Sequence, residues 1–319
     1  MSGLVAAKLL AVFATIAAGW VAGRTPLFRS EESARLLSNL AFYLFTPALL
    51  VSATARIDLA ALPWTTVAAY FGPAALLLLT WYGWKRRRRP GHPAAPSVRA
   101  LTLTFSNTVQ LGIPVVTAIF GADGLGILVT LISVHGLVLL TLATVLAESD
   151  LARVTEEGQS RPPLRSTIAT TARRTVIHPV TLPVLIGLLW NVTSLPIPRP
   201  VDETLSLLGQ GVVPVSLVTI GLTLAHYGIV GNRRRALALS AGKLLVMPAI
   251  VLPVAFAVGL RGTPLAVVVL CAALPIGANA LLFAQRYDTA QAETTAAIVT
   301  STVAFAATGP LWLLVAGAL

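Results

Sequence analysis

Apolar stretches of about 20 residues follow one another along almost the whole chain, and each is long enough to cross the hydrocarbon core of a membrane as a helix. Hydrophobic residues make up 56% of the sequence, charged residues 11%, and the mean hydropathy is +0.82. A chain with this composition is surrounded mainly by lipid, where helices satisfy their own backbone polar groups. We therefore predict an all-α integral membrane protein with ten transmembrane helices, at residues 3–23, 34–54, 62–84, 99–120, 124–147, 179–195, 204–227, 236–259, 263–285 and 292–318.

The basic residues predict the orientation of these helices. Of the 23 Lys and Arg residues, 18 lie in or beside the connections that follow odd-numbered helices, and three in those that follow even-numbered helices. Cytoplasmic loops carry the excess of basic residues. We therefore expect a multi-pass protein of the cytoplasmic (plasma) membrane with both termini outside and the odd-numbered connections in the cytoplasm. The net charge of +11 is scattered over these loop ends, which favours membrane lipids as partners and argues against nucleic-acid binding.

The longest connection divides the chain into two halves. Residues 1–147 hold five predicted helices, residues 148–177 form a polar cytoplasmic linker, and residues 178–319 hold the other five helices. Because each half has an odd number of spans, the second half must insert with the opposite orientation. The sequence thus predicts two inverted five-helix repeats.

Two predicted helices are interrupted by short polar sequences that carry Pro and Gly: Asn107–Pro114 in the fourth and Leu274–Asn279 in the ninth. The helical rise places the two breaks about 16 to 18 Å into the membrane from opposite sides, so they should meet near its centre. A break at this depth is tolerated where it lines a cavity, and paired breaks indicate the substrate site of a transporter. The candidate substrate-binding residues are Asn107, Gln110, Gly112, Pro114, Pro275, Gly277 and Asn279.

Few ionisable side chains are predicted deep in the membrane. His135 is expected about 15 Å into the fifth helix, either as a buried polar group bonded to a neighbouring carbonyl or as a substrate-binding or proton-binding residue. We expect Lys243 to extend its ammonium group to the cytoplasm, and Glu293 to be a solvated acid in the first turn of the tenth helix. The sequence places no carboxylate at mid-membrane.

Motifs of the common enzyme and metal-binding classes are missing. The sequence has no Walker loop, no His-Glu-x-x-His, no Gly-x-Ser-x-Gly and no Cys or His cluster with metal spacing. Direct ATP coupling and the corresponding hydrolytic mechanisms therefore lack their parts. We expect a protein that is not an enzyme and uses no cofactor or metal ion.

Four short sequences stand in a characteristic order along the chain. They are Phe45-Thr46-Pro47-Ala48, Asn107–Pro114, Pro214-Val-Ser-Leu with Gly221, and Ala273–Ala280. Together they resemble the auxin efflux carrier family of permeases, which includes plant auxin exporters and bacterial permeases linked to malate and related carboxylates. Asn107–Pro114 is similar to the family's Asn-x-Gly-x-Leu-Gly-Leu-Pro, and Val109 stands where the family usually has Gly. The resemblance covers the whole chain and identifies it as a bacterial member.

The resemblance implies ten helices in two inverted repeats, with the broken helices four and nine crossing at the substrate site. It also implies a mobile bundle that moves against a scaffold formed by the first two helices of each repeat. It further suggests a homodimer.

We therefore expect a secondary transporter that moves a small organic anion, such as a carboxylate or an auxin-like acid, by alternating access. Beyond each break a new half-helix should begin at mid-membrane, with Pro114 as a first helical residue, and its positive end should face the cavity. Asn107 and Asn279 would add neutral donors, so the anion is expected to be held without a salt bridge. Two alternatives stay open: a sodium-coupled symporter resembling the bile acid family, and a non-transporting membrane sensor with the same fold.

Overall fold

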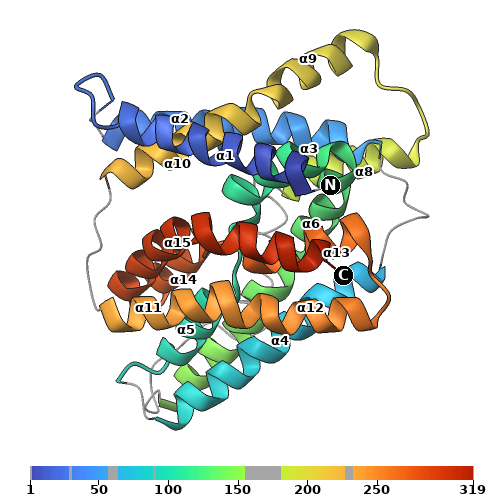
Figure 1. Ribbon diagram of the computed structural model, residues 1–319. Helices are drawn as coiled ribbons and strands as arrows, with labels where there is room; N and C mark the ends of the chain where they lie inside the picture. Colours follow the sequence, from blue (N-terminus) through green and yellow to red (C-terminus); the bar gives the residue numbers. More distant parts are fainter. Residues whose placement is uncertain are drawn as a thin grey trace.

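The computed structural model describes residues 2–28, 31–56, 64–88, 91–154, 181–226 and 233–318, and these residues form helices joined by short connections (Figure 1). Three short π-helical segments are labelled η: η1 and η3 are continuous with the α-helices on both sides, and η2 is continuous with the helix that follows it. The elements are α1 (Ser2–Ala22), α2 (Glu31–Leu40), η1 (Ala41–Phe45), α3 (Thr46–Thr54), α4 (Trp64–Arg87), α5 (Ala95–Thr104), η2 (Thr108–Gly112), α6 (Ile113–Val154), α8 (Thr181–Val192), α9 (Arg199–Gln210), α10 (Val212–His226), α11 (Arg233–Ala241), η3 (Gly242–Val246), α12 (Met247–Ala257), α13 (Gly262–Ala273), α14 (Asn279–Arg286) and α15 (Gln291–Gly317).

The expectation of an all-helical membrane protein is confirmed. Within the described residues, six helical stretches are long and apolar enough to cross a membrane, and three shorter apolar helices accompany them. The long stretches are Glu32–Thr54, Trp64–Arg87, Thr108–Leu151, Arg199–Ala225, Arg234–Ala257 and Gln291–Gly317, and the shorter helices are Leu10–Ala22, Leu182–Val192 and Gly262–Ala273.

The difference between six long stretches and ten predicted helices has local causes. The predicted fourth and fifth helices share the single stretch Thr108–Leu151, in which Gly121 has a φ of 66°. Only Gly adopts this left-handed conformation readily, so the residue marks the bend between the two. Helix α6 continues to Val154, so the first residues of the predicted linker are helical. Residues 155–180, which include the rest of the linker and the start of the sixth predicted helix, lie outside the described residues.

Each π-helical segment lies directly before a helix whose second residue is proline. These prolines are Pro47 after η1, Pro114 after η2 and Pro248 after η3. Proline has no N–H and its ring collides with the carbonyl one turn earlier. A single wide turn accommodates the ring without ending the helix, and it rotates the side chains that follow. The prolines therefore account for irregular turns in three of the predicted membrane helices.

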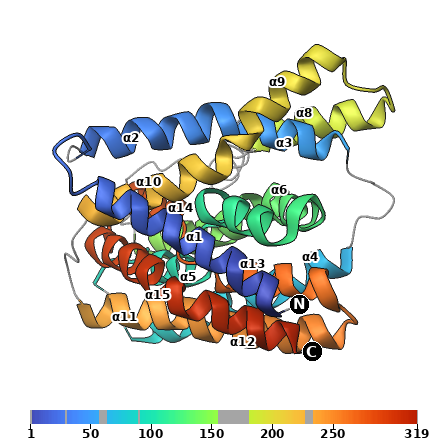
Figure 2. The same cartoon turned by 45° about the horizontal axis from the view of Figure 1, so that its top comes forward.

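The helices form two layers (Figures 1 and 2). In the first layer α1 packs on α10, and α3 packs on α8 and α9. In the second layer α4 packs on α5 and α12, while α11 and α13 both pack on α15. The long helix α6 contacts members of both layers, among them α10 and α13. The site described below lies between these layers.

Glycines allow the close contact between α1 and α10. A Cβ atom at Gly221 would lie 2.1 Å from the carbonyl oxygen of Ile16, and one at Gly19 would lie 2.3 Å from that of Val218. Both distances are far inside van der Waals contact, so any larger residue must separate the helices. Small residues serve this purpose at helix contacts within membranes.

Gly221→Ala should therefore lower thermal stability, by an amount of about 1 to 3 kcal/mol that is typical of overpacking. The measurement is the melting temperature of the purified protein in detergent. Gly72→Ala in α4 is the matched control, since a Cβ atom there meets nothing within 4 Å. Equal melting temperatures for the two variants would contradict the close contact.

Buried ion pairs join the ends of helices in the second layer. The Glu293 carboxylate at the start of α15 accepts from Arg99 of α5 and, at 3.4 Å, from Arg235 of α11. Only 5% of Glu293 is exposed. The prediction of a solvated acid at this position is therefore wrong: the two guanidinium groups come from segments far away in sequence and cover it.

Further polar contacts lie at the ends of α4, α6 and α14. Asp150 pairs with Arg86 at 2.9 Å and accepts from the Tyr82 hydroxyl at 2.7 Å. The Tyr287 hydroxyl donates to Glu148 at 2.9 Å. Burial and this hydrogen bond raise the pKa of Tyr287 above its usual value, so the hydroxyl keeps its proton at neutral pH. These contacts fasten helix ends to one another.

Candidate functional site

The two predicted breaks meet in the structure. Residues 105–107 separate α5 from η2, residues 274–278 separate α13 from α14, and Ser106 and Ile276 form an antiparallel β-bridge. The Asn107 N–H donates to the Pro275 carbonyl at 2.8 Å, and the Gly277 N–H donates to the Phe105 carbonyl at 2.9 Å. Each break thus supplies hydrogen-bond partners that the other has lost, as buried backbone in lipid requires.

Two of the predicted glycines make this crossing compact. A Cβ atom at Gly277 would lie 2.9 Å from the Ser106 carbonyl oxygen. One at Gly112 would lie 2.7 Å from the side chain of Leu274. Pro275 is buried in the same crossing and contributes its carbonyl to the bridge. These three candidate residues shape the crossing, and none of them lines the cavity described next.

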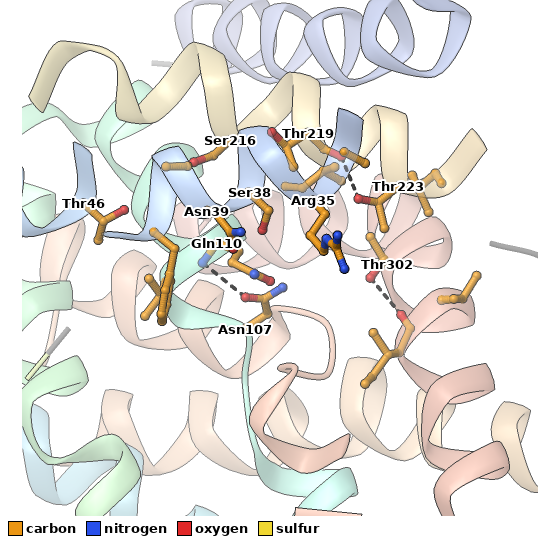
Figure 3. A pocket seen from close by; sticks show the side chains of 18 residues that line it. Arg35, Ser38, Asn39, Thr46, Asn107, Gln110, Ser216, Thr219, Thr223 and Thr302 are labelled. Carbon is orange, nitrogen blue, oxygen red and sulfur yellow. Dashed lines mark hydrogen bonds between the residues drawn. The ribbon is translucent and has the colours of Figure 1, made fainter. Parts of the chain in front are cut away.

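A cavity of about 300 Å³ lies beside the crossing, between the two layers. Its wall is formed by α2, η1 and α3 on one side, by α10, and by η2 and α15 on the other. Figure 3 shows the side chains that line it. The polar ones are Arg35, Ser38, Asn39, Thr46, Asn107, Gln110, Ser216, Thr219, Thr223 and Thr302.

Asn107 and Gln110 are the two candidate residues that line the cavity. The Asn107 side-chain oxygen accepts from the Gln110 N–H at 3.2 Å and so caps η2 (Figure 3). The new half-helix therefore begins at Thr108. The prediction that Pro114 is its first residue is wrong, because Asn107 already provides the cap and a π-helical turn precedes the proline.

Arg35 brings a positive charge to the cavity and was missed as a site residue. Its side chain extends from α2 towards the space above Asn107 (Figure 3). Among the described residues it has no ion-pair or hydrogen-bond partner, and none of the described lining residues is Asp or Glu. In the sequence alone, Arg35 is only one of the basic residues that predict the orientation.

The missed residues follow a pattern that was readable in the sequence. Arg35, Ser38, Asn39 and Thr46 recur at helical spacing along one face of the second predicted helix. Ser216, Thr219 and Thr223 do the same along α10. A polar stripe on a membrane helix faces the protein interior or water, because polar groups are costly in lipid.

His135 lies beside the crossing and is not among the residues that line the cavity. Its Nε2 atom is 3.1 Å from the Tyr70 hydroxyl, which is also 2.9 Å from the Ser106 hydroxyl. The imidazole ring packs edge-on against Phe105, with 4.4 Å between ring centroids, and is 2% exposed. In this position His135 supports the crossing segment. Asn279 begins α14 and is half-buried, outside the cavity wall.

Lys243 is fully buried, and the prediction that it extends to the cytoplasm is wrong. Its ammonium group donates to the carbonyl of Ala272, near the C-terminal end of α13. Lys243 belongs to η3, where the wide turn before Pro248 changes the direction of side chains.

The family model described as "Membrane transport protein" matches residues 4–313. The chain belongs to this family, the auxin efflux carrier family. The "Uncharacterized transporter YfdV" of Escherichia coli is 26% identical over 313 residues, which cover 96% of each chain. The similarity therefore extends over almost the whole length of both proteins.

Two plant proteins match shorter parts of this family member. "Auxin efflux carrier component 8" of Arabidopsis thaliana is 24% identical over 221 residues, which cover 57% of this chain and 60% of the plant protein. "Auxin efflux carrier component 1" of the same plant is 32% identical over 123 residues, 36% of this chain and 20% of the plant protein. The family assignment makes the chain a multi-pass membrane transporter and not an enzyme.

Proposed function

We propose that this transporter binds a small organic anion, such as a carboxylate or an auxin-like acid, in the cavity beside the crossing and moves it by alternating access. The observation that carries the proposal is the cavity wall, which combines amides, hydroxyls and one free guanidinium with no described acid. A polar wall with a positive charge attracts an anion and disfavours a cation.

Arg35 changes how the anion is held. The sequence predicted an anion bound without a salt bridge, by half-helix ends and amides alone. In the proposed site Arg35 supplies the charged partner, and Asn107 and Gln110 orient the ligand from the opposite wall. The start of η2 at Thr108 adds the partial positive charge of a helix N-terminus at the same wall.

We also propose the ten-helix architecture, in two inverted repeats of residues 1–147 and 178–319. The antiparallel bridge between Ser106 and Ile276 relates the fourth predicted helix to the ninth. The first predicted helix packs on the seventh, as α1 on α10, and the sixth packs on the second, as α8 on α3. In a five-helix repeat, helix one is equivalent to helix six, and helix two to helix seven. The two contacts are therefore equivalent to each other, as the repeat predicts.

The proposed orientation, with both termini outside and the odd-numbered connections in the cytoplasm, rests on the distribution of basic residues. The ion pairs support one part of it, namely that odd-numbered and even-numbered connections lie on opposite faces of the membrane. Glu293 and its two arginines all lie beside odd-numbered connections. Arg56 and Asp202, which pair with each other, both lie beside even-numbered connections. Each described ion pair therefore joins two helix ends beside odd-numbered connections or two beside even-numbered connections. This is expected if the two sets of connections lie on opposite faces of the membrane.

The proposal is tested by the melting temperature of the purified protein in a series of short carboxylic acids and aromatic acetic acids, each paired with its uncharged amide. A ligand that binds only the folded state stabilises it by about 2.7 kcal/mol at a concentration of 100 Kd. We expect at least one acid to stabilise the protein and its amide to have little effect. Equal stabilisation by acid and amide would contradict an anion site.

The stabilising acid is then used for counterflow in liposomes. Exchange of labelled for unlabelled acid across the membrane is expected of the proposed transporter. Binding without any counterflow would instead identify a sensor that keeps the fold.

A further inference from the structure

Lys243 is a buried cation whose environment contains no described acid. It is 0% exposed, and within the described part of the chain it has no ion pair with Asp or Glu. Its ammonium group is bound by one backbone carbonyl, that of Ala272. A bare ammonium group in the interior of a membrane protein is costly, so the site must compensate its charge.

The neighbouring elements supply polar but not acidic groups. Cys271 of α13 lies close to Lys243 and to Tyr70 of α4. The Tyr70 hydroxyl contacts Ser106 of the crossing and His135 of α6. All of these side chains are at most 2% exposed. The ammonium group therefore lies near a thiol and an imidazole, and neither of these neighbours is an acid that could form an ion pair with it.

The compensation comes from the broken end of α13. In an uninterrupted helix the Ala272 carbonyl would accept from the N–H of Ile276. Here that N–H donates to the Ser301 hydroxyl at 3.1 Å, and Gly277 N–H is directed to Phe105. Pro275 has no N–H to offer. The last turn of α13 thus has carbonyls without helical partners, and its end carries about half a negative charge.

Such helix ends at mid-membrane are where transporters with broken helices bind a coupling cation. In this chain the side chain of Lys243 occupies the corresponding position at the end of α13. A close contact holds η3 against α5, since a Cβ atom at Gly242 would lie 2.5 Å from the side chain of Leu103 in α5. The π-helical turn of η3 directs the adjacent Lys243 towards α13.

We propose that Lys243 is the resident cation of the crossing: its ammonium group occupies the site at the end of α13 that a metal cation would otherwise fill. The protein therefore needs no Na⁺ or K⁺ at this position, either to fold or to cycle. This separates it mechanistically from the sodium-coupled alternative. The proposal does not require the organic-anion site, because its test uses no substrate.

The test compares melting temperatures of the full-length protein in NaCl, KCl and N-methyl-D-glucamine chloride at equal ionic strength. Wild type should melt within about 1 °C in all three salts. Lys243→Ser removes the ammonium group and leaves a hydroxyl beside the free carbonyls, and Na⁺ should raise its melting temperature by about 2 to 6 °C over the organic cation. Lys85→Ser, a lysine on the surface of α4 above two tryptophan rings, is the matched control and should show no Na⁺ effect.

Two results would overturn the proposal. The first is a saturable Na⁺ or K⁺ stabilisation of wild type, which would mean that a metal cation binds despite the lysine. The second is a folded Lys243→Ser protein that is indifferent to Na⁺. Should that variant fail to fold, the wild-type comparison still decides, and Lys243→Arg, which keeps the charge, should fold and stay indifferent to Na⁺.

Discussion

Glu293→Gln should lower the free energy of unfolding by about 2 to 4 kcal/mol, because removing one partner of a buried ion pair leaves the other charge uncompensated. The carboxylate is 6% exposed and Arg99 19%, whereas Arg235 is 61% exposed and can turn to water. Most of the expected loss of stability therefore comes from leaving Arg99 without its partner. The free energy of unfolding is measured by denaturant or thermal unfolding in detergent.

Asp202→Asn provides the control for this change. It makes the same exchange of carboxylate for amide in the exposed pair with Arg56, where the side chains are 37% and 52% accessible. Solvent screens such pairs, and the expected loss is less than about 1 kcal/mol. A loss for Glu293→Gln no larger than that of Asp202→Asn would show that burial does not strengthen the Glu293 pairs.

Arg35→Gln should weaken binding of the stabilising acid by about 10- to 150-fold. A hydrogen bond to a charged group contributes about 1.5 to 3 kcal/mol, and each 1.4 kcal/mol is a factor of ten in Kd. Stability should change little, since Arg35 has no described partner to lose. The measurement is the Kd of the acid by titration calorimetry or by the shift in melting temperature.

Arg87→Gln controls for the loss of one positive charge elsewhere. Arg87 is exposed at the end of α4, away from the cavity wall. The neutral amide of the acid should bind Arg35→Gln and wild type alike. If Arg35→Gln and Arg87→Gln bound the acid with equal affinity, Arg35 would have no part in the site.

The sequence predicted the features that depend on local pattern. The length of the apolar stretches predicted the membrane helices, and polar residues next to Pro and Gly located both helix breaks. The similar depth of the two breaks in the membrane predicted that they meet, and the bridge between Ser106 and Ile276 confirms this. Asn107 and Gln110 were found because amides are rare and costly in an apolar helix.

The sequence did not predict the features that depend on distant partners. Glu293 looked solvated because its arginines lie 194 and 58 residues away along the chain. Lys243 looked long enough to reach the surface, and the carbonyl that binds it is open only because α13 is interrupted. Arg35 was read as a topology signal, although its spacing with Ser38 and Asn39 already formed a polar stripe.

The crossing is joined by main-chain atoms, and this has a consequence for how selectivity can diverge. The bonds between Asn107 and Pro275 and between Gly277 and Phe105 use only amide and carbonyl groups. Replacing Val109 or Gln110, whose side chains line the cavity, leaves all of those groups in place. The same main-chain crossing can thus support cavities of different size and polarity. Substrate selectivity can therefore change during evolution without any change in the hydrogen bonds of the crossing.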